Sequence, residues 1–104
     1  MFAAAGAQST KKVVPRVFEV AAIAYWDFDG QLKSEERSRG SPESESQKWM
    51  LDIRNYTVKI MEYSDRVYVT LSIRPFNGVA FQGGIRHYVL NEKTGEILEQ
   101  TGEK

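Results

Sequence analysis

The chain has 104 residues, 41% of them hydrophobic, and equal numbers of basic and acidic residues give it a formal net charge of zero. This length suits one domain with one core, and the apolar content argues against disorder throughout. A protein that neutralises phosphates needs a basic excess, so we expect no nucleic-acid partner. The lack of cysteine and the single histidine exclude disulfides, zinc ribbons and paired imidazole ligands. We expect no cofactor.

Residues 1–12 are predicted to be a flexible tail ahead of a single domain over residues 13–104. Within this tail, Ala5-Gly6-Ala7 also matches the small-residue pattern of a signal-peptidase site. Two locations therefore stay open: cytoplasmic, or periplasmic or secreted if these residues are a signal-peptide remnant. Charged residues interrupt the longest apolar run before it reaches the roughly 20 residues that span a bilayer, so no membrane partner is expected.

The segment from residue 13 to residue 28 is strongly apolar and fits two periodicities. As a strand, it has an apolar residue at every even position from Phe18 to Phe28. As a helix, it places one apolar stripe on a single side, formed by Val17, Val20, Ala21, Ala24 and Phe28. Helix is favoured because alanines are poor strand residues and Pro15 suits a first turn, and the strand remains the alternative.

Residues 30–48 are predicted to be an exposed insertion rich in Ser and Glu, because Leu32 is their only large apolar side chain. A short helix from Pro42 towards Asp52 is expected at its end. The C-terminal half then alternates apolar and polar residues in four runs, residues 56–63, 67–73, 85–90 and 96–100. The fold class that follows is α+β: an N-terminal helix packed on a four-stranded antiparallel meander.

The last two runs resemble a known group of small proteins. Gly83-Gly84, the strand up to Leu90, and the Asn91–Leu98 segment with its Lys-Thr-Gly turn are similar to the closing hairpin of NTF2-fold immunity proteins of bacterial toxin systems. The helix followed by a meander looks more broadly like the cystatin-like and NTF2-like folds. This resemblance implies a protein that binds and neutralises a partner toxin and has no catalytic site.

Aromatic and basic residues interleave on neighbouring strands and form the candidate partner-binding surface: Tyr68, Arg74, Arg86 and Tyr88. Tyrosine and arginine often anchor protein interfaces, so we expect a protein partner, with the chain itself a monomer or a homodimer. The same residues could instead stack nucleic-acid bases, or the two tyrosines could pair across strands.

An alternative function is that of an NTF2-like enzyme or small-molecule binder with a pocket between helix and sheet. His87 and Trp26 would line that pocket. His87 could act as a general base there, with Asp27 or Asp52 beside it, because histidine titrates near neutral pH.

A third hypothesis is calcium binding by a degenerate EF-hand-like loop over residues 25–36. Asp27, Asp29, Gly30 and Glu36 match the ligand and turn positions of that loop. Tyr25 occupies the first ligand position, where an aspartate normally lies, which weakens the match.

Overall fold

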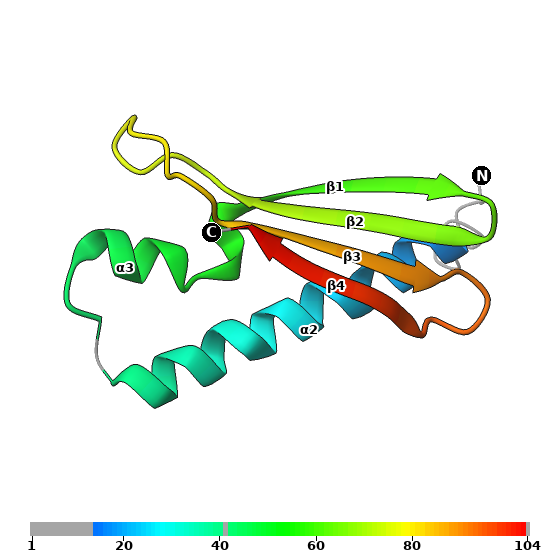
Figure 1. The fold of residues 1–104 in the computed structure, drawn as a ribbon, viewed down its shortest axis with the longest axis horizontal. Coiled ribbons are helices and arrows are strands. Elements are labelled where there is room, and N and C mark those ends of the chain that lie inside the picture. The colour runs from blue at the N-terminus through cyan, green and yellow to red at the C-terminus, as the bar shows by residue number, and fades with distance from the viewer. Residues whose placement is uncertain (1–13, 41, 104) are drawn as a thin grey trace, which may run out of the picture.

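A computed structural model describes residues 14–40 and 42–103 (Figure 1). A long helix, α2 (Arg16–Arg39), is followed by a short helix, α3 (Glu45–Met50), and a 3-10 turn, η1 (Ile53–Asn55). Four strands come next: β1 (Tyr56–Tyr63), β2 (Arg66–Ile73), β3 (Ile85–Asn91) and β4 (Ile97–Glu103). They form one antiparallel sheet in the order β1-β2-β3-β4 with α2 packed on it, which confirms the predicted α+β fold. The predicted tail of residues 1–12 lies outside the described residues.

The helix forms because one stripe of its surface is apolar from Val20 to Leu32. Residues four apart lie on the same side of a helix, and the buried side chains of α2 follow that spacing: Val20, Ala24, Phe28 and Leu32. They pack on the face of the sheet that carries the buried residues Val67, Val69, Leu71, Tyr88 and Leu90. The alternative of a strand over this segment is therefore wrong.

The helix is longer than the sequence predicted, because residues 30–39 continue it and do not form an insertion. Two ion pairs between successive turns support this part of α2: Lys33 lies 2.9 Å from Asp29, and Arg39 lies 3.1 Å from Glu35. Leu32 adds a buried anchor. The helix ends at Gly40, which has a φ of 84°, a backbone region that glycine adopts without strain.

Register within the sheet decides which side chains share a face. Tyr68 of β2 lies opposite Met61 of β1 and opposite Val89 of β3. Val89 in turn lies opposite Glu99 of β4, next to a register shift in that strand. Because successive strand residues point to opposite faces, these four positions form one row on the same side of the sheet.

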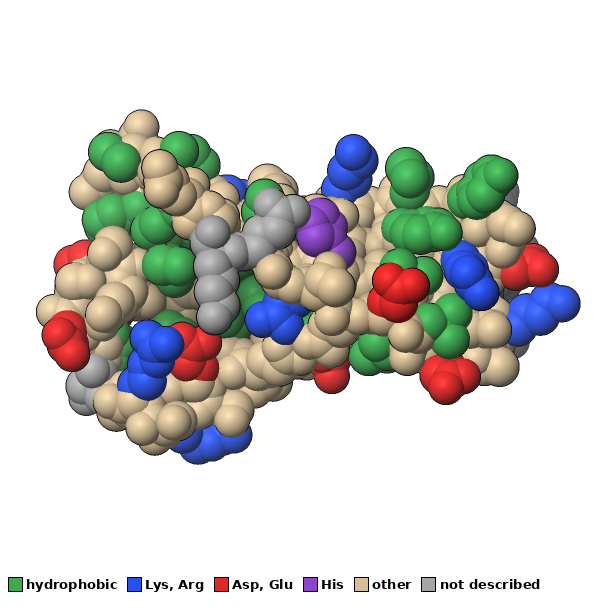
Figure 2. Space-filling model, viewed as in Figure 1, with side chains coloured by type: hydrophobic (Ala, Val, Ile, Leu, Met, Phe, Trp, Pro, Cys, Tyr) green, Lys and Arg blue, Asp and Glu red, His purple; other side chains and the backbone are tan. Residues whose placement is uncertain are grey.

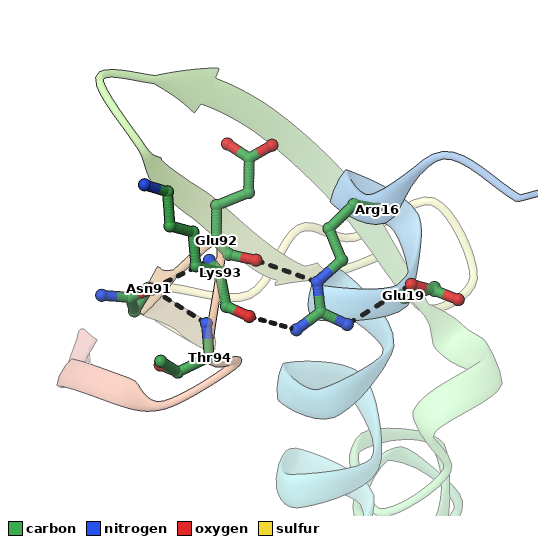
Figure 3. A network of polar contacts seen from close by, with 6 residues as sticks. All are labelled: Arg16, Glu19, Asn91, Glu92, Lys93 and Thr94. Carbon is green, nitrogen blue, oxygen red and sulfur yellow. Dashed lines mark hydrogen bonds and ion pairs between the residues drawn. The ribbon is translucent and has the colours of Figure 1, made fainter.

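The N-terminal end of α2 is tied to the turn between β3 and β4 (Figure 3). The Arg16 guanidinium donates hydrogen bonds to the carbonyl oxygens of Glu92 at 2.9 Å and Lys93 at 2.8 Å. Asn91 shapes that turn, because its side-chain oxygen accepts from two backbone N–H groups of the turn. Gly95 closes the turn with a φ of 79°, a left-handed conformation that glycine adopts without strain.

Candidate functional site

The two faces of the sheet differ in what covers them. Helix α2 covers the inner face, whereas no described element covers the opposite one, which we call the outer face. Figure 2 shows the molecule from this side: hydrophobic side chains, in green, lie to the right of the purple His87 among scattered acidic and basic residues. An uncovered sheet face normally carries polar side chains, so this apolar group needs an explanation.

An apolar row crosses the outer face, formed by Met61, Tyr68 and Val89 on β1, β2 and β3, and Leu98 extends it at the register shift of β4. Met61 is 54% exposed and Leu98 is 38% exposed, whereas Tyr68 and Val89 on the central strands are half-buried. The register shift in β4 places both Leu98 and Glu99 between the inward-facing Ile97 and Gln100. Tyr63, which is 71% exposed, adds an aromatic ring at the end of β1.

Exposed charged residues of opposite sign lie near the two ends of the apolar row, basic residues on β1 and β2 and acidic residues at β4. Lys59 of β1 and Arg66 of β2 are exposed on one side, and Glu96 and Glu99 are exposed on the β4 side. Within the described part of the chain, none of these four side chains forms an ion pair or a hydrogen bond. A pattern of unpaired charges around an apolar centre is typical of an interface core with a polar rim.

Only half of the predicted partner-binding residues are available to a partner. Tyr68 lies on the outer face, and Arg74 is exposed just beyond the end of β2, about 20 Å along the strand from Tyr68. Arg86 and Tyr88 point the other way, towards α2, and Tyr88 is fully buried. The prediction was wrong for these two residues, and the two tyrosines do not pair across strands because they lie on opposite faces.

Arg86 and Tyr88 belong instead to a polar network between helix and sheet. The Tyr88 hydroxyl donates to the Asp27 carboxylate at 2.8 Å, and the Gln31 amide donates to the same carboxylate oxygen at 2.7 Å. Arg86 donates to the side-chain oxygens of Gln31 and Gln100, and its guanidinium lies over the Phe28 ring. Burial and the adjacent Asp27 carboxylate raise the pKa of Tyr88 well above its usual range. The network therefore fastens α2 to the sheet and is not available as a binding surface.

The predicted pocket between helix and sheet, lined by His87 and Trp26, is not formed. Apolar side chains fill that space. His87 lies on the outer face, where its Nδ1 is 3.2 Å from the Thr70 hydroxyl, whereas Trp26 lies on the exposed side of α2. Asp27 is on the inner side of the sheet, so it cannot serve His87 as a catalytic partner.

A hollow lies between α2 and the α3–η1 segment. This open groove has a volume of about 600 Å³, and Tyr25, Trp26, Leu51 and Ile53 contribute its apolar wall. Four of its charged lining residues form two ion pairs with one another, Asp29 with Lys33 and Asp52 with Arg54. Trp26 thus lines a groove, but a different one from that expected.

The calcium-loop hypothesis is also wrong. Asp27, Asp29 and Glu36 all lie within the continuous helix α2, with Glu36 about two turns beyond Asp29, and a helical backbone cannot wrap around an ion. Asp27 binds Tyr88 and Asp29 binds Lys33. No group of three or more possible ligands that could hold a metal ion is found among the described residues.

Comparisons of this chain with protein-family models, curated proteins and solved structures found no match. Among the described helices, none has the length and apolar character needed to cross a membrane.

Sequence reasoning missed Met61, Val89 and Leu98. A signal was present, because the alternating strands carry apolar residues at both odd and even positions. In a sheet that is covered on one side only, either the odd or the even strand positions face water and are normally polar.

Proposed function

We propose that this chain is a non-enzymatic protein-binding module whose docking surface is the outer face of the sheet. The observation that carries this proposal is the apolar row Met61, Tyr68, Val89 and Leu98, which crosses every strand and has no described element over it. Burying such a row removes apolar area from water at roughly 25 cal/mol per Å². The surrounding charged residues would then orient the partner on this face and disfavour partners whose charges do not match.

The predicted pairing of His87 with Asp27 or Asp52 is not formed. His87 lies on the outer face, and the carboxylate of Asp27 is engaged on the inner side. The other predicted partner, Asp52, is held by Arg54 next to η1. Toxin neutralisation, which the resemblance of the closing hairpin implies, is one form of this function.

Site-specific photo-crosslinking tests the proposal. A photoreactive phenylalanine analogue is placed at Met61 on the outer face, or at Phe18 on α2 as the matched control, because these side chains are 54% and 52% exposed. After irradiation in the producing cells, we expect protein adducts from position 61 and far fewer from position 18. Mass spectrometry then identifies the attached chain.

A second variant distinguishes specific docking on the outer face from nonspecific crosslinking. Tyr68→Ser in the position-61 background removes the central ring of the apolar row and should reduce adduct formation at least fivefold. Adducts from neither position, or mainly from position 18, would contradict the proposal.

A further inference from the structure

We propose that the partner on the outer face is a second copy of this chain, so that two sheets pack face to face around a twofold axis parallel to the strands. This inference rests on the proposed function and adds the identity and orientation of the partner. The product is a symmetric sandwich with the two α2 helices on its outside.

The shape of the single chain indicates a missing layer. The radius of gyration of its Cα atoms is 17.0 Å, compared with about 13 Å for a compact domain of 100 residues. Among the described residues, α2 packs on the inner face of the sheet and no element lies over the outer face (Figure 1). A second sheet could cover it at a spacing of about 10 Å, with strand directions within about 30° of each other, as in aligned sandwiches.

The charges on the outer face make it complementary to itself. Lys59 and Arg66 lie on the side of β1 and β2, and Glu96 and Glu99 lie on the β4 side. All four side chains are exposed and unpaired within the described chain. A surface with basic residues on one side and acidic residues on the other can bind a copy of itself when symmetry brings unlike sides together.

The direction of the twofold axis follows from this arrangement. An axis parallel to the strands places β1 of one copy over β4 of the other, and β2 over β3. Lys59 then faces the region of Glu99, and Arg66 faces the region of Glu96. An axis perpendicular to the strands would place β1 over β1 and bring like charges together, which is unfavourable.

The same axis also brings the apolar rows together. Tyr68 of one copy lies over Val89 of the other, and Met61 lies over the bulge formed by Leu98 and Glu99, because Met61, Tyr68, Val89 and Glu99 occupy one level of the sheet. Four strands of about seven residues cover roughly 19 Å by 23 Å. This is smaller than a standard interface, so we expect a dissociation constant on the order of 10 μM.

Analytical ultracentrifugation of the purified chain with charge-reversed variants tests the orientation. One variant, K59E/R66E, makes both sides of the face acidic, and another, E96K/E99K, makes both sides basic. Each alone should self-associate at least tenfold more weakly than the unchanged chain. An equimolar mixture of the two should form a dimer again, because every contact then joins unlike charges.

Matched controls remove the effect of net charge. R37E/K48E and E36K/E43K carry the same charge changes at exposed positions on α2, on α3 and between these helices. Both control variants should dimerise as strongly as the unchanged chain does. An equimolar mixture of the two controls should associate no more strongly than either control alone. Equal rescue by the control mixture, or a homodimer that the face variants leave intact, would overturn the proposed orientation.

The test also separates this inference from the function on which it rests. The unchanged chain could stay monomeric at millimolar concentration while crosslinking from position 61 captures a different protein. That result would contradict the inference of a second copy and would support the proposed binding function. A monomeric chain from which position 61 captures no protein would contradict both the inference and the proposed function.

Discussion

The hydroxyl of Tyr88 donates a 2.8 Å hydrogen bond to the carboxylate of Asp27, joining the middle of β3 to the middle of α2. Both groups lie at the edge of the apolar core, where an unpaired polar atom is unfavourable. Because this contact engages Tyr88 inside the protein, the ring of Tyr88 is not available to a partner, and the proposed docking surface is the opposite face of the sheet.

Replacement of Tyr88 by Phe should destabilise the fold by about 1–3 kcal/mol, because the Asp27 carboxylate loses a donor in a half-buried position. Urea denaturation followed by circular dichroism measures this change. Tyr68→Phe, on the outer face, is the control and should shift stability by less than about 0.5 kcal/mol. Equal effects of the two substitutions would show that the inner network does not hold the helix.

Gly95→Ala should destabilise the protein by about 1–2 kcal/mol, because an L-residue is strained in the left-handed region. Gly95 has a φ of 79°, and an added Cβ would lie 2.6 Å from Cδ1 of Ile23. Gly30→Ala is the matched control: it lies within α2 with no atom within 4 Å of an added Cβ. We expect it to stabilise the helix by about 0.5–1 kcal/mol, and the same denaturation experiment measures both. Stabilisation by both substitutions would disagree with the turn geometry.

Asp52 should make stability depend on pH in the acid range. Hydrogen bonds from the Arg54 side chain and backbone lower the pKa of Asp52 from its ordinary value to about 2. A carboxylate whose pKa is lowered by folding stabilises the native state above its unfolded pKa, and this contribution is lost as the pH falls towards 2. Asp52→Asn should therefore reduce stability at neutral pH and flatten its decline between about pH 4 and pH 2.

Thermal unfolding of the unchanged chain and of Asp52→Asn at several pH values measures this difference. Glu43→Gln, at an exposed position, should leave the pH profile unchanged. Parallel profiles for the unchanged chain and Asp52→Asn would mean that the contact with Arg54 adds no pH dependence.

The sheet could be predicted from the sequence because its signals are local. Alternation marked the strands, and the turn ending at Gly95 has the side chains that this geometry requires. The end of α2 could not be predicted as well, because residues 30–39 contain one large apolar side chain and depend on ion pairs such as Glu35–Arg39. Composition alone does not distinguish such a helical segment from an exposed loop.

The assignment of faces failed for a different reason. Alternation correctly separates Arg86 and Tyr88 from His87 and Val89, but it does not say which set faces the helix. Both sets contain apolar atoms, so the choice depends on tertiary partners such as Asp27, which is 61 residues from Tyr88 in the sequence. Such long-range contacts are not encoded in any local pattern.

The most direct test of the outer face is a dilution series of the isotopically labelled chain followed by two-dimensional NMR. The account predicts concentration-dependent amide shifts at Met61, Tyr68 and Val89, with Phe18 and Trp26 on α2 unchanged. Shifts that cluster on the helix, or spectra that do not change up to millimolar concentration, would contradict the docking of a second copy on this face.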